Sequence, residues 1–160
     1  MAVVNLTATK LSNLSVMDSP QVGTIHGLNI HSWTIEVGAA DADTSTYLIA
    51  HLPSNARIHD QSWIGFDDLA SSSAPTLDIG TFNVTGGSDD VDSINDGFTP
   101  ATAVRSVEFI KLLADIGKYL WDIAGESSDP GGFIDIKLTV DDADIDQAGT
   151  IAGEIFYSME

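Results

Sequence analysis

Ile134-Asp135-Ile136-Lys137-Leu138-Thr139-Val140 is the stretch that decides the fold class of this chain. Its apolar residues occupy every second position, and polar residues occupy the positions between them. Successive side chains of a β-strand point to opposite faces, so this period of two predicts a strand with one face in a core and the other toward solvent. The branched residues isoleucine, valine and threonine favour the same conformation.

Similar but less regular apolar runs occur on both sides of this stretch. They cover residues 33–37, 47–52, 57–66, 76–84 and 151–157. Turn-forming residues separate them, as at Pro53-Ser54-Asn55-Ala56 and Ser128-Asp129-Pro130-Gly131-Gly132. Short strands divided by turns are typical of a sandwich rather than of βαβ units. We therefore predict a mainly all-β fold, an antiparallel, jelly-roll-like β-sandwich of seven to eight strands with one short helix.

Two local arrangements are expected within the first two thirds of this fold. The runs 47–52 and 57–66 flank the Pro53 turn and are expected to form a hairpin. Residues 85–106 are rich in Gly, Asp, Ser and Thr and are expected to be the longest irregular stretch.

The short helix is expected from Ser106 to Gly117. Apolar residues recur there at helical spacing in two sets, Val107/Ile110/Leu113 and Phe109/Leu112/Ile116. Periodicity alone leaves a strand possible for so short a run. From Tyr119 onward the chain is expected to return to β structure.

The length of 160 residues fits one domain with a substantial core. Residues 1–24 have weak periodicity, and we interpret them as an extended N-terminal arm before a single β-sandwich domain at 25–160. The N-terminus has no basic segment ahead of an apolar one, so it does not resemble a secretory signal. No run approaches the roughly 20 apolar residues of a membrane span.

Charge and cysteine content exclude several function classes. Six Lys and Arg face 24 Asp and Glu, and the net charge of -18 repels nucleic-acid phosphates and anionic membranes. Nucleic acid and membrane are therefore not expected as partners. The chain has no cysteine, which excludes disulfides, thiolate metal sites and cysteine nucleophiles. Clusters of Asp at 41–44, 67–68, 89–92 and 141–146 are interpreted as solvated loops.

The four histidines are candidates for catalytic or metal-binding groups. His26 and His31 differ in parity and would face opposite sides of one strand, whereas His51 and His59 flank the 53–56 turn and could meet across a hairpin near Asp60. No HExxH pattern or third convergent ligand accompanies them. We interpret them as polar residues at strand ends.

Other chemical motifs also fail. Asp142, Asp144 and Asp146 alternate like calcium ligands, but the EF-hand glycine and glutamate positions hold Gln147 and Gly153. Weak binding of calcium or magnesium by these clustered carboxylates stays possible, with a solvated turn favoured. Nucleophile elbows, phosphate loops and dinucleotide fingerprints are absent, and Gly131-Gly132 is interpreted as a turn. We predict no catalytic, cofactor-binding or metal-binding residues.

Several segments resemble small, β-rich virion proteins of tailed bacteriophages, in a region that covers about residues 45–160. The resemblance lies in Tyr47-Leu48-Ile49-Ala50-His51-Leu52-Pro53-Ser54-Asn55-Ala56-Arg57-Ile58, Thr76-Leu77-Asp78-Ile79-Gly80, Lys118-Tyr119-Leu120-Trp121-Asp122-Ile123-Ala124-Gly125, and Asp129-Pro130-Gly131-Gly132 through Gly149-Thr150-Ile151-Ala152. It implies a non-enzymatic capsid decoration or cement protein that stabilises the phage head by bridging capsomers. It also implies a homotrimer that is made in the host cytoplasm, lies on the capsid exterior and has the major capsid protein as its partner.

Two other functions stay open at this stage. The first is a tail, collar or head-fibre subunit, which is also a virion structural protein. The second is a carbohydrate-binding β-sandwich module, in which Trp33, Trp63 and Trp121 would form a sugar platform, although tryptophans on β segments lie more often in a core or a subunit interface. An enzyme is the class that the sequence favours least.

Overall fold

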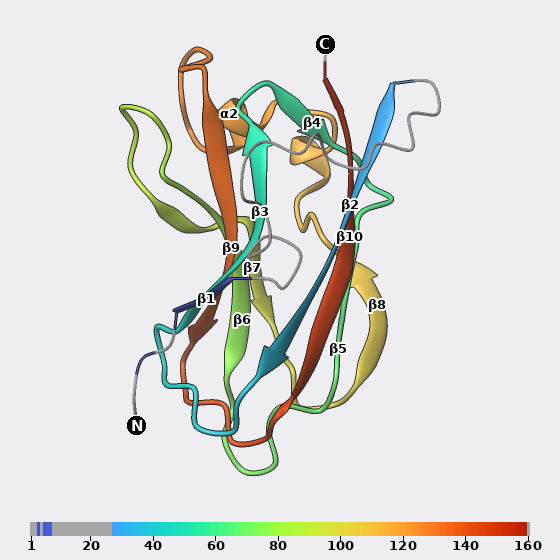
Figure 1. The fold of residues 1–160 in the computed structure, drawn as a ribbon, viewed down its shortest axis with the longest axis vertical. Helices are drawn as coiled ribbons and strands as arrows, with labels where there is room; N and C mark the ends of the chain where they lie inside the picture. The colour runs from blue at the N-terminus through green and yellow to red at the C-terminus, as the bar shows by residue number, and fades with distance from the viewer. Residues whose placement is uncertain (1–2, 4, 8–26, 160) are drawn as a thin grey trace.

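Two β-sheets face each other across a shared core, and a computed structural model describes them for residues 3, 5–7 and 27–159 (Figure 1). The strands of the first sheet, in spatial order, are β1 (Asn5–Thr7), β3 (Thr46–Pro53), β9 (Phe133–Asp141), β6 (Thr76–Phe82) and β7 (Asp90–Phe98). Those of the second sheet are β2 (Leu28–Val37), β10 (Gly149–Met159), β5 (Trp63–Phe66) and β8 (Val104–Glu108), and β4 (Ala56–Ile58) also pairs with β10. The predicted mainly β, antiparallel sandwich is confirmed.

Strand β9, the stretch that predicted the fold, lies at the centre of the first sheet. It pairs antiparallel with β3 on one side and β6 on the other. Its four alternate apolar side chains are each 0% exposed and belong to the core between the two sheets: Ile134, Ile136, Leu138 and Val140. The alternation therefore marks the core face, as expected from the period of two. The three-residue β1 is parallel to β3.

Strand β10 has the corresponding central place in the second sheet. It pairs antiparallel with β2 over ten residue pairs and with β5 on its other side. Gly153 lies opposite Trp33, and a Cβ atom at Gly153 would come within 2.7 Å of the Trp33 ring. The missing side chain therefore makes room for Trp33, which is 2% exposed.

The described residues contain ten strands, more than the seven to eight predicted. Two of the extra strands, β1 and β4, have three residues each, which is too short for a period of two to be recognised. Another, β7, lies inside the stretch 85–106 that was predicted to be irregular, so that prediction was wrong. Its pairing with β6 is interrupted by two register shifts, which obscure the alternation.

The predicted hairpin between residues 47–52 and 57–66 was also wrong. The chain crosses from β3 in the first sheet to β4 in the second at Ser54-Asn55. Residues 57–66 divide into β4 and β5, and both of these strands pair with β10. Their partner comes from the end of the chain, so the local sequence contains no sign of it.

The helix predicted for Ser106–Gly117 does not form. Strand β8 ends at Glu108, and a 3-10 turn follows at Leu113–Asp115. Val107 pairs with Ile64 of β5, and Phe109 is 0% exposed, so pairing and burial outweigh a weak helical period. The short helix lies further along, as α2 (Leu120–Ile123), where β structure was predicted.

The predicted N-terminal arm, 1–24, lies mostly outside the described residues, as does His26. Within the described part of that arm, Asn5–Thr7 form β1. Among the residues described, no helix has the length and apolar character needed to cross a bilayer.

Candidate interaction surface

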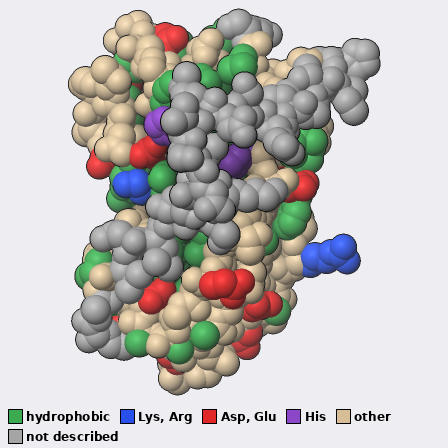
Figure 2. Space-filling model, viewed as in Figure 1, with side chains coloured by type: hydrophobic (Ala, Val, Ile, Leu, Met, Phe, Trp, Pro, Cys, Tyr) green, Lys and Arg blue, Asp and Glu red, His purple; other side chains and the backbone are tan. Residues whose placement is uncertain are grey.

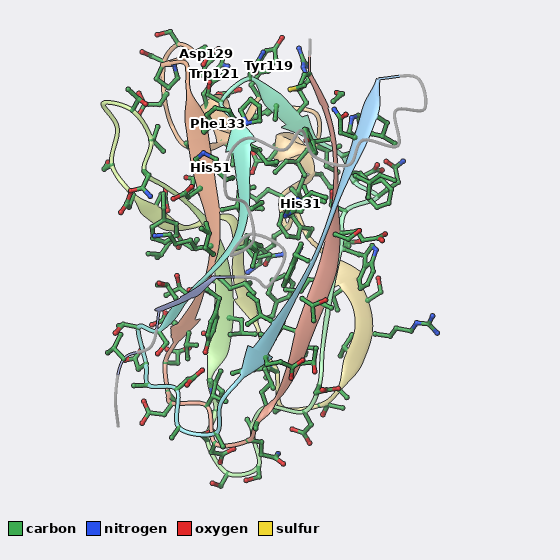
Figure 3. The ribbon with its side chains drawn as sticks, in the orientation of Figure 1. His31, His51, Tyr119, Trp121, Asp129 and Phe133 are labelled. Carbon is green, nitrogen blue, oxygen red and sulfur yellow. The ribbon has the colours of Figure 1, made fainter. Side chains whose placement is uncertain are left out.

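Two stacked aromatic pairs lie near one end of the sandwich (Figure 3). The first pair is His51 near the end of β3 and Phe133 at the start of β9. Their ring centroids are 4.7 Å apart with an angle of 10° between the planes. Antiparallel register brings them together, since Pro53 is the partner of Phe133 and His51 that of Asp135. Phe133 is 43% exposed, so one face of the pair is open to a partner.

The second pair is Tyr119 and Trp121, at the start of α2, with ring centroids 5.7 Å apart and an angle of 16°. The Arg57 guanidinium lies 3.9 Å from the centroid of the Tyr119 ring, a cation–π arrangement. Its Nη1 also donates to the Gly117 carbonyl at 2.9 Å. The Trp121 amide donates to the Ser54 carbonyl at 3.0 Å, which fixes α2 to the β3–β4 crossing.

Two carboxylates hold the loops around these aromatic side chains. Asp135 accepts from His51 Nδ1 at 2.6 Å when that nitrogen carries a proton, and its other oxygen accepts from the Asn83 amide. Asp129 Oδ1 accepts from the Ser54 hydroxyl at 2.5 Å and the Gly131 amide at 2.8 Å. These hydrogen bonds, the one from Ser54 above all, lower the pKa of the Asp129 carboxyl below its usual value.

We define the aromatic end as His51, Phe133, Tyr119, Trp121 and Arg57. Its side chains come from β3, β4, β9 and the α2 region. The sequence points to His51 and Trp121 but not to these pairings, because Arg57 and Tyr119 are distant in sequence and no spacing pattern links them. Gly131 and Gly132 have φ values of +72° and +77°, which fits their interpretation as turn residues.

His31 and His59, the other histidines within the described part of the chain, lie apart from this surface. His31 Nε2 lies 2.9 Å from the Ile49 carbonyl oxygen and so connects β2 to β3 across the sandwich. His59 Nε2 lies 3.1 Å from the Ser158 hydroxyl in the second sheet. His51 belongs to the first sheet, so the expected meeting of His51 and His59 across a hairpin was wrong.

The carboxylates of the 141–146 loop point to different parts of the protein. Asp142 accepts from the Thr76 hydroxyl at 3.1 Å, and Asp144 accepts from the Asp43 amide at 2.7 Å. Asp146 accepts from the Ser71, Ser72 and Ser73 amides at 2.6, 2.8 and 3.0 Å. Among the described residues, no group of three or more His, Cys, Asp or Glu is placed to hold a metal ion.

The three tryptophans do not share a surface. Trp33 faces the core, and Trp63 lies on the outer face of the second sheet, where its Nε1 donates to Glu154 at 3.2 Å. Trp121 is at the aromatic end. The three tryptophans therefore do not form the sugar platform that the sequence left open, and Trp33 lies in the core, as is more usual for a tryptophan on a β segment.

Acidic side chains are spread over the face in Figure 2, with the largest group in its lower half, and the histidines on that face lie in its upper half. The aromatic end combines ring faces with a guanidinium, and the hydrogen-bonded carboxylates of Asp129 and Asp135 lie beside it. This combination suits adhesion to another molecule, since aromatic and arginine side chains are enriched in the centres of protein interfaces.

No known protein family matches the chain, and no curated protein matches its sequence. Two solved structures do contain chains with this fold. A chain of "Capsid of Ralstonia phage GP4" superposes with a TM-score of 0.66 and 15% identity, over 98% of this chain and 99% of that chain. A chain of "Cyanophage Pam1 capsid asymmetric unit" superposes with a TM-score of 0.56 and 12% identity, over 86% and 90% of the two chains. At these identities the likeness establishes a shared fold.

Proposed function

We propose that this chain is a non-enzymatic structural protein of a tailed-phage virion, which decorates or cements the capsid exterior by bridging capsomers. One observation carries the proposal: almost the whole chain superposes on almost the whole of a chain from a phage capsid. A second capsid structure contains a similar chain. A fold alone does not determine function, so charge and surface must agree with this role.

The net charge of -18 favours the outside of the shell. A surface of this sign is repelled by the phosphates of a packaged genome and gains nothing from facing them. The proposed partners are the major capsid protein and further copies of the chain itself, as a homotrimer.

The aromatic end is the surface that we assign to the capsid contact. Phe133 is 43% exposed and stacked on His51, so it needs little ordering when it binds. The Arg57 guanidinium over the Tyr119 ring likewise fixes the position of Tyr119 before it binds.

Co-sedimentation with capsid shells tests this function. The purified chain is expected to pellet with shells assembled from the major capsid protein of the same phage. Phe133→Ser should weaken binding at least tenfold, while Ala101→Ser, at an exposed residue between β7 and β8 near the opposite end of the sandwich, should leave it unchanged. A wild-type chain that stays in the supernatant would contradict the proposal.

Copy number in purified virions separates capsid from tail, collar or head-fibre placement. A cement protein should be present in hundreds of copies and a collar protein in about a dozen. Quantitative mass spectrometry against the major capsid protein gives the ratio.

The N-terminal arm is assigned a role in gripping a neighbouring capsomer. Deletion of residues 1–20 removes β1, which is a three-residue edge strand, and should leave a folded domain that no longer binds shells. Circular dichroism checks the fold, and retained binding would refute the role of the arm.

Carbohydrate binding is the second candidate, favoured by the stacked Tyr119–Trp121 pair beside exposed carboxylates. A glycan array with the wild-type chain and with Trp121→Ala tests it. Binding that is lost in the variant would support this function, and an array without signal would remove it.

A further inference from the structure

Asp96-Gly97 is the one place in the 160-residue sequence where an aspartate or asparagine precedes a glycine. In such a pair the backbone nitrogen of the glycine can attack the side-chain carboxyl carbon of the residue before it, because no glycine side chain shields the nitrogen. The product is a succinimide ring. Water opens this ring at either carbonyl carbon and gives aspartate or isoaspartate, in which the backbone runs through the former side chain.

Asp96 and Gly97 lie in a β-bulge of strand β7. The pairing of β7 with β6 shifts register here, so that these two residues stand opposite the single residue Asp78. Gly97 has a φ of +87°, which glycine adopts readily, and a Cβ atom on it would meet nothing within 4 Å. Both residues of the pair are exposed, so the Asp96 side chain has room to turn toward the Gly97 nitrogen.

The buried Asp78 carboxylate is aimed at this nitrogen. Asp78 is 4% exposed, and its Oδ1 accepts from the Gly97 amide at 2.8 Å. A carboxylate that accepts from an N–H group can also receive its proton. Burial raises the pKa of Asp78 to about 6, which makes it a stronger base than an ordinary aspartate and still leaves it mostly ionised at neutral pH.

Lys111 contacts the same peptide group at its other end. Its ammonium donates to the Asp96 carbonyl oxygen, which belongs to the peptide bond that Gly97 nitrogen completes. Negative charge that develops when the nitrogen loses its proton is shared with that oxygen, and an adjacent cation stabilises it. Lys111 Nζ also lies 3.8 Å from Asp96 Oδ2, so the cation stands beside the carboxyl group that is attacked.

We propose that Asp96-Gly97 is a site of self-modification, at which the folded chain converts Asp96 to succinimide and then to isoaspartate. A bond forms between Gly97 nitrogen and Asp96 Cγ, and the bond from Cγ to the hydroxyl of the acid form of Asp96 breaks. The proton of the nitrogen passes to Asp78 and ends on the departing hydroxyl, which leaves as water. Hydrolysis returns one water, so the net change is an isomerisation without another reactant. This inference does not depend on the proposed function.

Incubation of the full chain in heavy-oxygen water tests the proposal. Each hydrolysis of the succinimide leaves one heavy oxygen at residue 96, whichever product forms. Electron-transfer mass spectrometry of protease fragments locates the label and separates isoaspartate from aspartate. At neutral pH the native chain should gain label at Asp96 and not at Asp92, which is exposed in the same strand and precedes a serine. A native chain without label at Asp96, or with equal label at both positions, would overturn the proposal.

Two variants separate the effect of the contacts from that of the sequence. Asp78→Asn removes the base and Lys111→Met removes the cation, and each should slow labelling at Asp96 at least tenfold while circular dichroism shows a native fold. Lys118→Met, which removes a cation that pairs with Asp115 instead, should leave the rate unchanged. An unchanged rate in either folded variant, or labelling as fast in guanidinium chloride as in the native chain, would overturn the inference.

Discussion

A buried hydrogen bond between Tyr47 and Asp41 gives the sharpest test of how this sandwich is stabilised. The Tyr47 hydroxyl donates to Asp41 Oδ2 at 2.7 Å, and both residues are buried, at 0% and 7% exposure. Burial, with help from the neighbouring carboxylate, raises the pKa of Tyr47 far above its usual value, so its hydroxyl keeps its proton at any ordinary pH. Tyr47→Phe removes this one donor and preserves the ring.

The expected loss of stability follows from what Asp41 keeps. A hydrogen bond to a charged group is worth about 1.5–3 kcal/mol, and the Gly38 amide still donates to Asp41 at 3.2 Å, which favours the lower end. For a chain of this size, about 1.5–2 kcal/mol lowers Tm by roughly 3–8 °C.

Urea unfolding monitored by tryptophan fluorescence measures the difference, with Tyr157→Phe as the matched control. Tyr157 is also buried, at 2% exposure, and its hydroxyl has no partner among the described residues, so its loss should cost little. If the two variants unfold at the same urea concentration, the Tyr47–Asp41 bond does not stabilise the protein and the reasoning is wrong.

Three further predictions concern other parts of the sandwich. Burial raises the pKa of Asp78 to about 6, so the folded state binds a proton more tightly than the unfolded state. Wild-type stability should therefore fall as pH rises from about 4 to 6. Asp78→Asn should flatten this pH dependence of the urea midpoint. Hydrogen bonds from the Ser72 hydroxyl and the Ser71 amide hold the pKa of Asp146 well below its usual range. The contribution of these bonds to stability is therefore present above about pH 4 and is lost as pH falls further. At neutral pH, Asp146→Asn should speed amide hydrogen exchange at 71–73, and unchanged exchange would contradict this. Ile136→Ala should cost about 2–5 kcal/mol in urea unfolding because the side chain is 0% exposed at the centre of β9, and a smaller loss would mean that the sheets close around the cavity.

The strands that the sequence predicts well are long and have one face packed in the core. The alternation at 134–140 predicted β9 because four residues at alternate positions all enter the core. It failed where a strand is short or pairs with a distant segment, as β4 does with the end of β10. The hydrogen bonds of such a strand come from residues about a hundred positions away, and local periodicity contains no information about them.

The candidate surfaces were less predictable than the fold. The helical spacing at 106–117 predicts a helix that contains Leu112 and Leu113, because a sequence pattern does not distinguish an exposed leucine from a buried one. The structure shows them in a loop between buried Phe109 and Leu120. Similarly, the Asp cluster at 41–44 was predicted to be a solvated loop, yet Asp41 is buried and accepts a hydrogen bond from the Tyr47 hydroxyl. Burial at these positions depends on contacts that only the folded chain makes.

The strong negative charge and the proposed homotrimer are compatible because charge repulsion and apolar contacts respond differently to salt. At physiological ionic strength charges are screened beyond about 8 Å, so the repulsion between chains of charge -18 is strong at low salt and weakens as salt is added. Contacts between copies that bury apolar side chains are not screened by salt. Self-association, measured by sedimentation, should therefore strengthen between low and moderate salt. An association that weakens steadily as salt is added would mean that ion pairs, and not apolar contacts, hold the copies together.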